Sequence, residues 1–166
     1  MGLVNRLSLL MAKMGCAGLR NTSEENKDNL KYVKAVVKAQ GPRSFQFASD
    51  YIRSDAESLI EMVGINPEII RFSKKQIYDR YCEDMSIVEN EIVDELIFAL
   101  KCLEIDENAF IYFNEKLQLK LANILKTKQS YEGKFAGKPC VIDLKQLTSN
   151  ENLMFLINCL ETSKCC

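Results

Sequence analysis

Histidine and tryptophan are absent from this chain of 166 residues, and proline and glycine are scarce, with three and seven residues. Without histidine, neither a Ser-His-Asp nor a Cys-His catalytic site can be built. So few residues that break helices favour a helical chain over a β architecture with many turns. The hydrophobic share of 47% and the charged share of 27% are those of a globular protein. The length predicts a single domain over residues 1–166.

Cysteine, by contrast, is frequent, with seven residues. No two of them form a CxxC pair, and no histidine is present to complete a zinc site, so we predict neither a metal nor a cofactor. An odd number of thiols, with Cys102 and Cys159 on apolar helix faces, is typical of free cysteines in a reducing compartment. We therefore predict a cytoplasmic protein, or one delivered into another cell if it is an effector. No stretch approaches the ~20 apolar residues that span a membrane.

Helix starts are marked by the capping box, in which Ser or Thr is followed three residues later by Glu or Gln. Apolar residues with helical spacing follow each of these starts. The sequence therefore predicts an all-α fold, an irregular helical-repeat bundle of seven or eight helices. The five capping boxes are Thr22/Glu25, Ser54/Glu57, Ser73/Gln76, Ser86/Glu89 and Thr148/Glu151.

The predicted domain has four parts. Residues 1–21 hold an N-terminal helix and a linker, and residues 3–14 are an amphipathic helix expected to cover the core, with binding to a membrane surface as the alternative. Degenerate helical repeats occupy 22–127. Gly133, Gly137 and Pro139 surround a short apolar run within 128–147, which predicts a small loop or hairpin insertion near 131–147. A C-terminal helix and tail fill 148–166.

An internal repeat underlies the second part. Residues 42–52 align without gaps with 67–77, and more weakly with 107–117. Such a unit, a helix followed by a turn and a short aromatic segment, cannot bury its apolar face alone, so neighbouring copies are expected to stack. Apolar residues recur at the positions Phe45/Ile70/Phe110, Phe47/Phe72/Tyr112 and Ile52/Ile77/Leu117.

The first copy carries a family resemblance. A helix that ends in Val-x-x-x-Gly-Pro precedes the segment Phe-Gln-Phe-Ala-Ser-Asp-Tyr-Ile-Arg-Ser-Asp, at residues 37–42 and 45–55. This pattern resembles the short helical repeats of the domain of unknown function 4116 family, well over residues 28–77 and loosely over 95–117. Those repeats occur, often in tandem, in bacterial and protist proteins. The resemblance implies a helical-repeat fold; the family has no assigned activity, although some members occur in secreted bacterial effectors.

We predict a non-catalytic module that binds another protein, in the manner of a bacterial or viral effector or inhibitor. In repeat proteins, side chains at equivalent exposed positions line one continuous face, and Tyr and Arg are enriched at binding hot spots. Gln46 and Arg71, and likewise Asp50 and Lys75, are such equivalent positions. The predicted partner-binding residues are Tyr51, Arg53, Arg71, Lys74, Lys75 and Tyr78.

Two alternatives remain open. The first is a nucleic-acid-directed protein, because Lys27, Lys31, Lys34 and Lys38 form a basic ridge, while residues 79–107 carry ten Asp or Glu against two basic residues and could imitate a phosphate backbone. The second is an enzyme that uses the thiol of Cys140, next to a Gly/Pro loop, or one of two carboxylate pairs. Those pairs, each with helical i, i+4 spacing, are Glu57/Glu61 and Glu91/Glu95.

Overall fold

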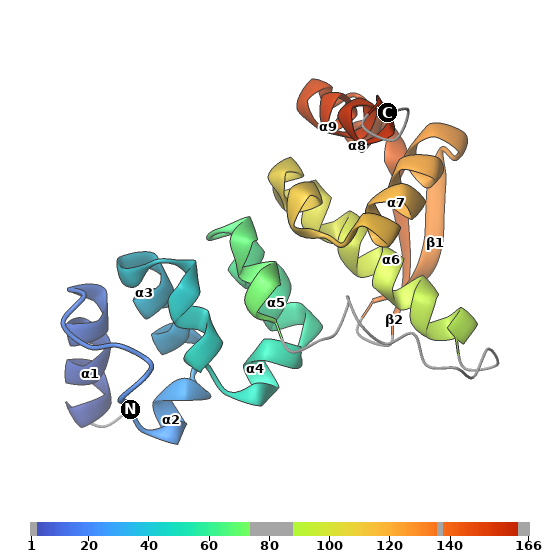
Figure 1. Ribbon diagram of the computed structural model, residues 1–166. Helices are drawn as coiled ribbons and strands as arrows, with labels where there is room; N and C mark the ends of the chain where they lie inside the picture. Colours follow the sequence, from blue (N-terminus) through green and yellow to red (C-terminus); the bar gives the residue numbers. More distant parts are fainter. Residues whose placement is uncertain (1–2, 74–87, 136–137, 163–166) are drawn as a thin grey trace. The chain divides into compact units, whose positions relative to one another are not determined.

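The computed structural model describes residues 3–73, 88–135 and 138–162, which form nine α-helices, three 3-10 helices and one two-stranded sheet (Figure 1). The predicted all-α fold with a small hairpin is confirmed. The predicted number of helices is too low. The helices α2 (Glu24–Lys27), α4 (Asp50–Ser54) and α8 (Leu144–Thr148) have only four or five residues, too few to show a helical hydrophobic period.

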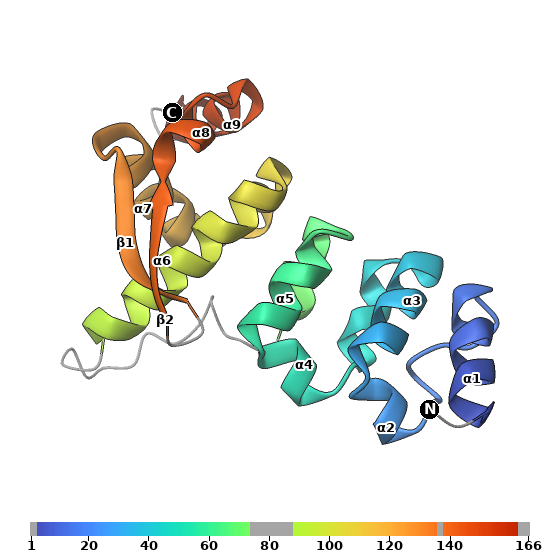
Figure 2. The same cartoon turned by 180° about the vertical axis from the view of Figure 1, so that it is seen from behind.

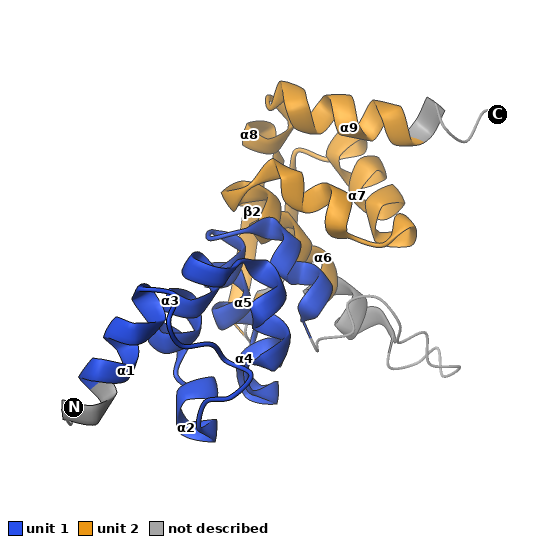
Figure 3. Ribbon diagram, turned by 60° about the vertical axis from the view of Figure 1, so that its left-hand side comes forward, with its two compact units in different colours: residues 1–75 blue, residues 76–166 orange. Residues whose placement is uncertain are grey.

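Where the sequence predicts one domain, the structure divides into two compact units, residues 1–75 and residues 76–166 (Figure 3). The first copy of the repeat and the described part of the second, residues 67–73, lie in unit 1, and the third copy lies in unit 2. The predicted repeat region, 22–127, is thus shared between both units.

Unit 1 stacks short helices side by side. Figures 1 and 2 show α3 (Leu30–Gln40) between α1 (Leu3–Lys13) and α5 (Ala56–Val63), and α1 packs on α3. The 3-10 helices η1 (Pro42–Phe47) and η2 (Pro67–Phe72) follow α3 and α5. The core is formed by apolar side chains of α3, η1, α4, α5 and η2, together with Leu19 from the segment between α1 and α2: Leu19, Val33, Phe45, Ile52, Leu59, Met62, Ile69 and Ile70.

The three copies of the repeat share one local structure. Each contains a six-residue 3-10 helix: η1, η2, and η3 (Glu107–Tyr112) in unit 2. In each copy the fourth residue of that helix, Phe45, Ile70 or Phe110, is buried and accepts a hydrogen bond from an extended residue just beyond the helix. Each 3-10 helix packs on the α-helix before it, and η1 also packs on η2. Neighbouring copies therefore bury apolar surface that one copy would leave exposed.

Helices begin at capping residues close to the predicted ones. The side chains of Ser23 and Asp55 accept hydrogen bonds from backbone N–H groups in the first turns of α2 and α5. The side chain of Asn150 does the same for α9 (Glu151–Thr162). Each lies one or two residues after the predicted cap, because the sequence places two suitable capping residues in succession. The predicted boxes that begin at Ser73 and Ser86 extend over residues outside the described ones.

Unit 2 combines helices with the hairpin. Its strands, β1 (Ser130–Phe135) and β2 (Lys138–Asp143), are antiparallel, and Tyr131 pairs with Ile142. A lone hairpin is marginal in water, and here α6 (Val88–Ile105) packs along β1. The helix α7 (Glu115–Thr127) precedes the hairpin, whereas residues 144–147, predicted as part of the insertion, belong to α8. The core includes Ile97, Leu100, Leu121, Ile142 and Leu144.

Candidate interaction surfaces

The predicted partner-binding residues that the structure describes are Tyr51, Arg53 and Arg71. Tyr51 on α4 is 68% exposed. Arg71 on η2 is also exposed, and its guanidinium lies 3.8 Å from the carboxylate of Glu68 one turn earlier. Lys74, Lys75 and Tyr78 lie outside the described residues, so the pair of equivalent positions Asp50 and Lys75 is not described in full.

Arg53 has a structural contact that its sequence position does not suggest. Its Nε donates a hydrogen bond of 2.9 Å to the backbone carbonyl of Phe72, the last residue of η2. Burial lowers the pKa of Arg53, and the nearby carboxylate of Asp50 partly offsets this effect. The side chain that immediately follows the first copy thus contacts the 3-10 helix of the second.

The predicted face is not assembled as expected. Tyr51 and Arg53 are two residues apart on α4 and flank the buried Ile52, so they lie on different sides of the helix. One pair of equivalent positions, Gln46 and Arg71, is exposed on two 3-10 helices that pack together. Of the described residues of the predicted face, Tyr51, Gln46 and Arg71 are exposed, whereas Arg53 contacts η2.

The basic ridge is interrupted. The four lysines do not lie on one helix, since Lys27 ends α2 and the other three belong to α3, which begins at Leu30. The ammonium group of Lys27 forms an ion pair of 2.7 Å with Glu24, and that of Lys34 forms one with Glu61 on α5. Half of the positive charge proposed to contact phosphate already has a carboxylate partner.

The acidic segment 79–107 falls largely outside the described side chains, which resume at Glu95. Burial raises the pKa of Glu95, with Lys120 and Lys116 opposing the shift. The carboxylate of Glu104 lies 3.9 Å from the ammonium group of Lys101. At the end of the segment, Asp106 caps η3 through the N–H of Asn108. The described carboxylates of the segment thus have different local environments.

The candidate catalytic groups belong to three elements, α5, α6 and β2. Cys140 is partly exposed in β2, opposite Gly133. Glu57 and Glu61 are exposed on α5, while Glu91 lies outside the described side chains. Among residues 3–73, 88–135 and 138–162, no three Cys, Asp or Glu side chains are placed to hold a metal ion.

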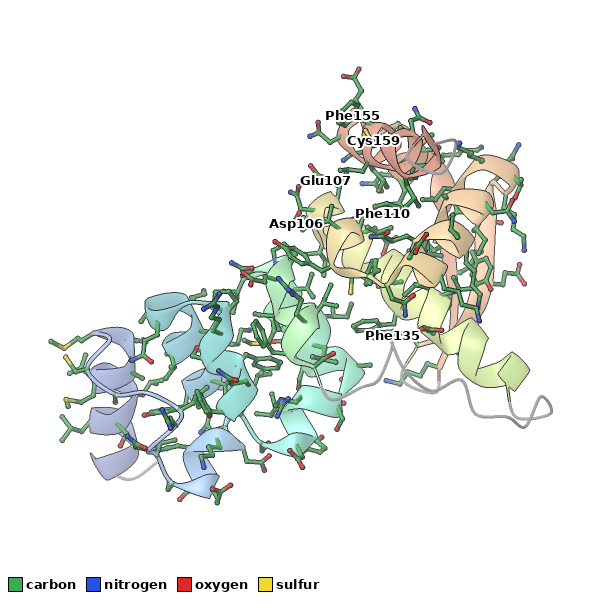
Figure 4. All side chains as sticks on the ribbon, viewed as in Figure 1. Asp106, Glu107, Phe110, Phe135, Phe155 and Cys159 are labelled. Carbon is green, nitrogen blue, oxygen red and sulfur yellow. The ribbon has the colours of Figure 1, made fainter. Side chains whose placement is uncertain are left out.

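A surface that the sequence analysis missed lies where α9 packs on η3 (Figure 4). Phe155 on α9 is 66% exposed, and Cys159 follows it by one turn on the same side. Asn152, one turn before Phe155, donates a hydrogen bond of 3.3 Å to the carboxylate of Glu107. We call this set, Asn152, Phe155 and Cys159 with Asp106 and Glu107, the α9 face.

Hydrogen bonds position the carboxylate of Glu107 on the α9 face. Glu107 has a lowered pKa because its own backbone N–H donates to the carboxylate, and the amide of Asn152 adds a second hydrogen bond. Exposed Glu104 lies near the end of α6, just before η3, and exposed Glu151 is the first residue of α9. An exposed aromatic side chain is therefore accompanied by negative charge. A sequence signal existed: Leu153, Leu156, Ile157 and Leu160 form the inward stripe of α9, and Phe155 falls outside it.

Comparison of the chain with protein-family models, with curated protein sequences and with solved structures gives no match. None of the helices in the described segments has the length and apolar character that crossing a membrane requires.

Proposed function

We infer that this protein is a non-catalytic interaction module that binds another protein through the α9 face. The observation that carries the proposal is Phe155, a large apolar side chain that is 66% exposed on α9, one turn after Asn152, which donates a hydrogen bond to the ionised Glu107. Exposed apolar groups rimmed by polar residues mark protein-binding sites, and aromatic side chains are enriched at the centres of interfaces.

The charges define the partner. Because Glu104, Asp106, Glu107 and Glu151 are acidic, we expect the partner to present an apolar pocket for Phe155 with Lys or Arg around it. Complementary charge of this kind speeds association and suppresses wrong partners more than it adds affinity. The proposal agrees with the family resemblance of residues 28–77, which implies a repeat fold of the kind that serves as a binding scaffold.

The experiment compares three equally exposed side chains. A photoreactive phenylalanine analogue replaces Phe155, Val141 or Tyr51, which are 66%, 65% and 68% exposed. We expect one protein to be crosslinked from position 155 in cell extract and not from position 141. Substitution of Glu107 by Gln in the same chain should weaken that crosslink, and rising salt should weaken it further.

Two results would overturn the proposal. Equal crosslinking from positions 155 and 141 would mean that exposure alone, and not the α9 face, determines capture. Crosslinking from position 51 alone would move the binding surface to the face of Tyr51 in unit 1.

A further inference from the structure

The helix α1 exposes apolar side chains where the sequence predicted that it would cover the core. Leu7, Leu10, Met11 and Met14 are 61%, 53%, 42% and 67% exposed. Their spacing, i, i+3, i+4 and i+7, places them on one side of the helix. We call these four residues the α1 stripe. The opposite side faces the protein, where Ala12 is fully buried and α1 packs on α3.

The stripe is fixed and does not belong to a frayed end. The helix closes with a Schellman motif, in which Gly15 has a φ of 74°, its N–H bonds to the carbonyl of Ala12, and the N–H of Cys16 bonds to that of Met11. Gln40, the last residue of α3, donates hydrogen bonds to the carbonyls of Gly15 and Ala17. These bonds hold the end of α1 against α3 and keep Met14 on the stripe.

The charged residues in the segment that contains the α1 stripe are all basic. Residues 3–23 contain Arg6, Lys13 and Arg20 and no Asp or Glu. Arg6 and Lys13 are exposed, and the helical period of about 100° per residue places both next to Leu10, on one edge of the stripe. Arg20 lies with its guanidinium carbon 5.8 Å from the ring centroid of Phe47. An apolar helix face bordered by cations alone is the pattern of helices that lie in the interface of an anionic bilayer.

We propose that the α1 stripe binds the surface of an anionic lipid membrane, with its four side chains among the acyl chains and Arg6 and Lys13 at the lipid phosphates. Nucleic acid would use the cations but gain nothing from the apolar side chains. The α9 face, which is also apolar but acidic, is repelled by such a surface. The lipid site is therefore separate from the proposed protein site.

The test uses the absence of tryptophan. Leu10→Trp places one fluorophore on the stripe, and Phe155→Trp places one on the α9 face as a control of similar exposure. Vesicles of phosphatidylcholine with 30% phosphatidylglycerol are added to each full-length variant. We expect a blue shift of the emission for Leu10→Trp alone, its loss with pure phosphatidylcholine, and its decline as salt rises.

Cosedimentation with the same vesicles measures affinity without a fluorophore. Leu7→Asn with Leu10→Asn should lower partitioning at least about tenfold, and Arg6→Gln with Lys13→Gln about tenfold at low salt. Both pairs change exposed residues, and circular dichroism checks that the helical content is unchanged. Phe155→Asn should leave partitioning as it is.

No binding to the phosphatidylglycerol vesicles would overturn the proposal, and so would an equal loss from Phe155→Asn. Equally strong binding to vesicles of pure phosphatidylcholine would show that Arg6 and Lys13 do not contribute to binding, which contradicts the proposal. If the chain self-associates in solution and Leu7→Asn with Leu10→Asn abolishes that association instead, the stripe is an interface between copies and the membrane proposal is wrong. None of these outcomes bears on crosslinking from position 155.

Discussion

The contact between Arg53 and the carbonyl of Phe72 leads to a quantitative prediction about how the first two copies hold together. Replacing Arg53 by Met keeps most of the apolar stem and removes the donor of the 2.9 Å hydrogen bond. A hydrogen bond that involves a charged group contributes about 1.5–3 kcal/mol, and a part-buried carbonyl left without a partner adds a desolvation cost. We expect Arg53→Met to lower the free energy of unfolding by about 2 kcal/mol.

Urea denaturation followed by circular dichroism measures this loss. With a slope of about 2 kcal/mol per molar urea, the midpoint should fall by about 1 M at unchanged slope. Hydrogen exchange then localises the effect, because the amides of η2 should exchange faster while those of the hairpin in unit 2 keep their rates.

Arg71→Met is the matched control. Its guanidinium is exposed and lies 3.8 Å from Glu68, and such surface ion pairs contribute at most about 1 kcal/mol. If Arg53→Met proves no less stable than Arg71→Met, the hydrogen bond does not hold η2 in place, and Arg53 returns to the set of residues available for a partner.

Three further predictions concern unit 2. Phe110→Ala should cost about 3–5 kcal/mol in a urea titration because Phe110 is 2% exposed, whereas Ile111→Ala, at the half-exposed next position, should cost under about 1 kcal/mol. Burial raises the pKa of Glu95. The folded protein therefore loses stability as pH rises from the ordinary carboxyl pKa through the raised one. Glu95→Gln should raise the urea midpoint at pH 7 and leave it unchanged near pH 3. Burial also raises the pKa of the Cys102 thiol, so mass spectrometry after brief alkylation of the native protein should find Cys159 modified and Cys102 intact.

Local sequence signals predicted much of the fold. Phe45, Ile70 and Phe110 were aligned from the sequence, and the structure places all three at the buried fourth position of a 3-10 helix. The hairpin was predicted from its glycines and Pro139, since two strands need a turn between them. These features depend on residues close in the chain. The division into two units was not predicted, because it depends on which elements pack together over long distances.

The contact of Arg53 with η2 was not predicted, for the same reason. An arginine on a short polar helix is usually at the surface. Arg53 turns inward because it donates a hydrogen bond to the carbonyl of Phe72, which lies nineteen residues later in the chain. Tyr51 is exposed as expected, but a sequence alignment of repeats cannot show that it and Arg53 lie on different sides of α4 when the helix is only five residues long.

The two exposed apolar faces differ in how far sequence could identify them. In α9 a single inward stripe is distinct, and Phe155 lies outside it. In α1, apolar residues surround most of the helix, and only packing on α3 shows that Ala12 faces inward and Leu7 outward. Exposed apolar side chains do not show which kind of partner would cover them, because the hydrophobic effect is non-directional. The neighbouring charges distinguish the two kinds of partner, since Glu107 repels an anionic surface while Arg6 and Lys13 attract one. The sign of charge beside each face is therefore the reason for proposing lipid as the partner of one helix and a basic protein as the partner of the other.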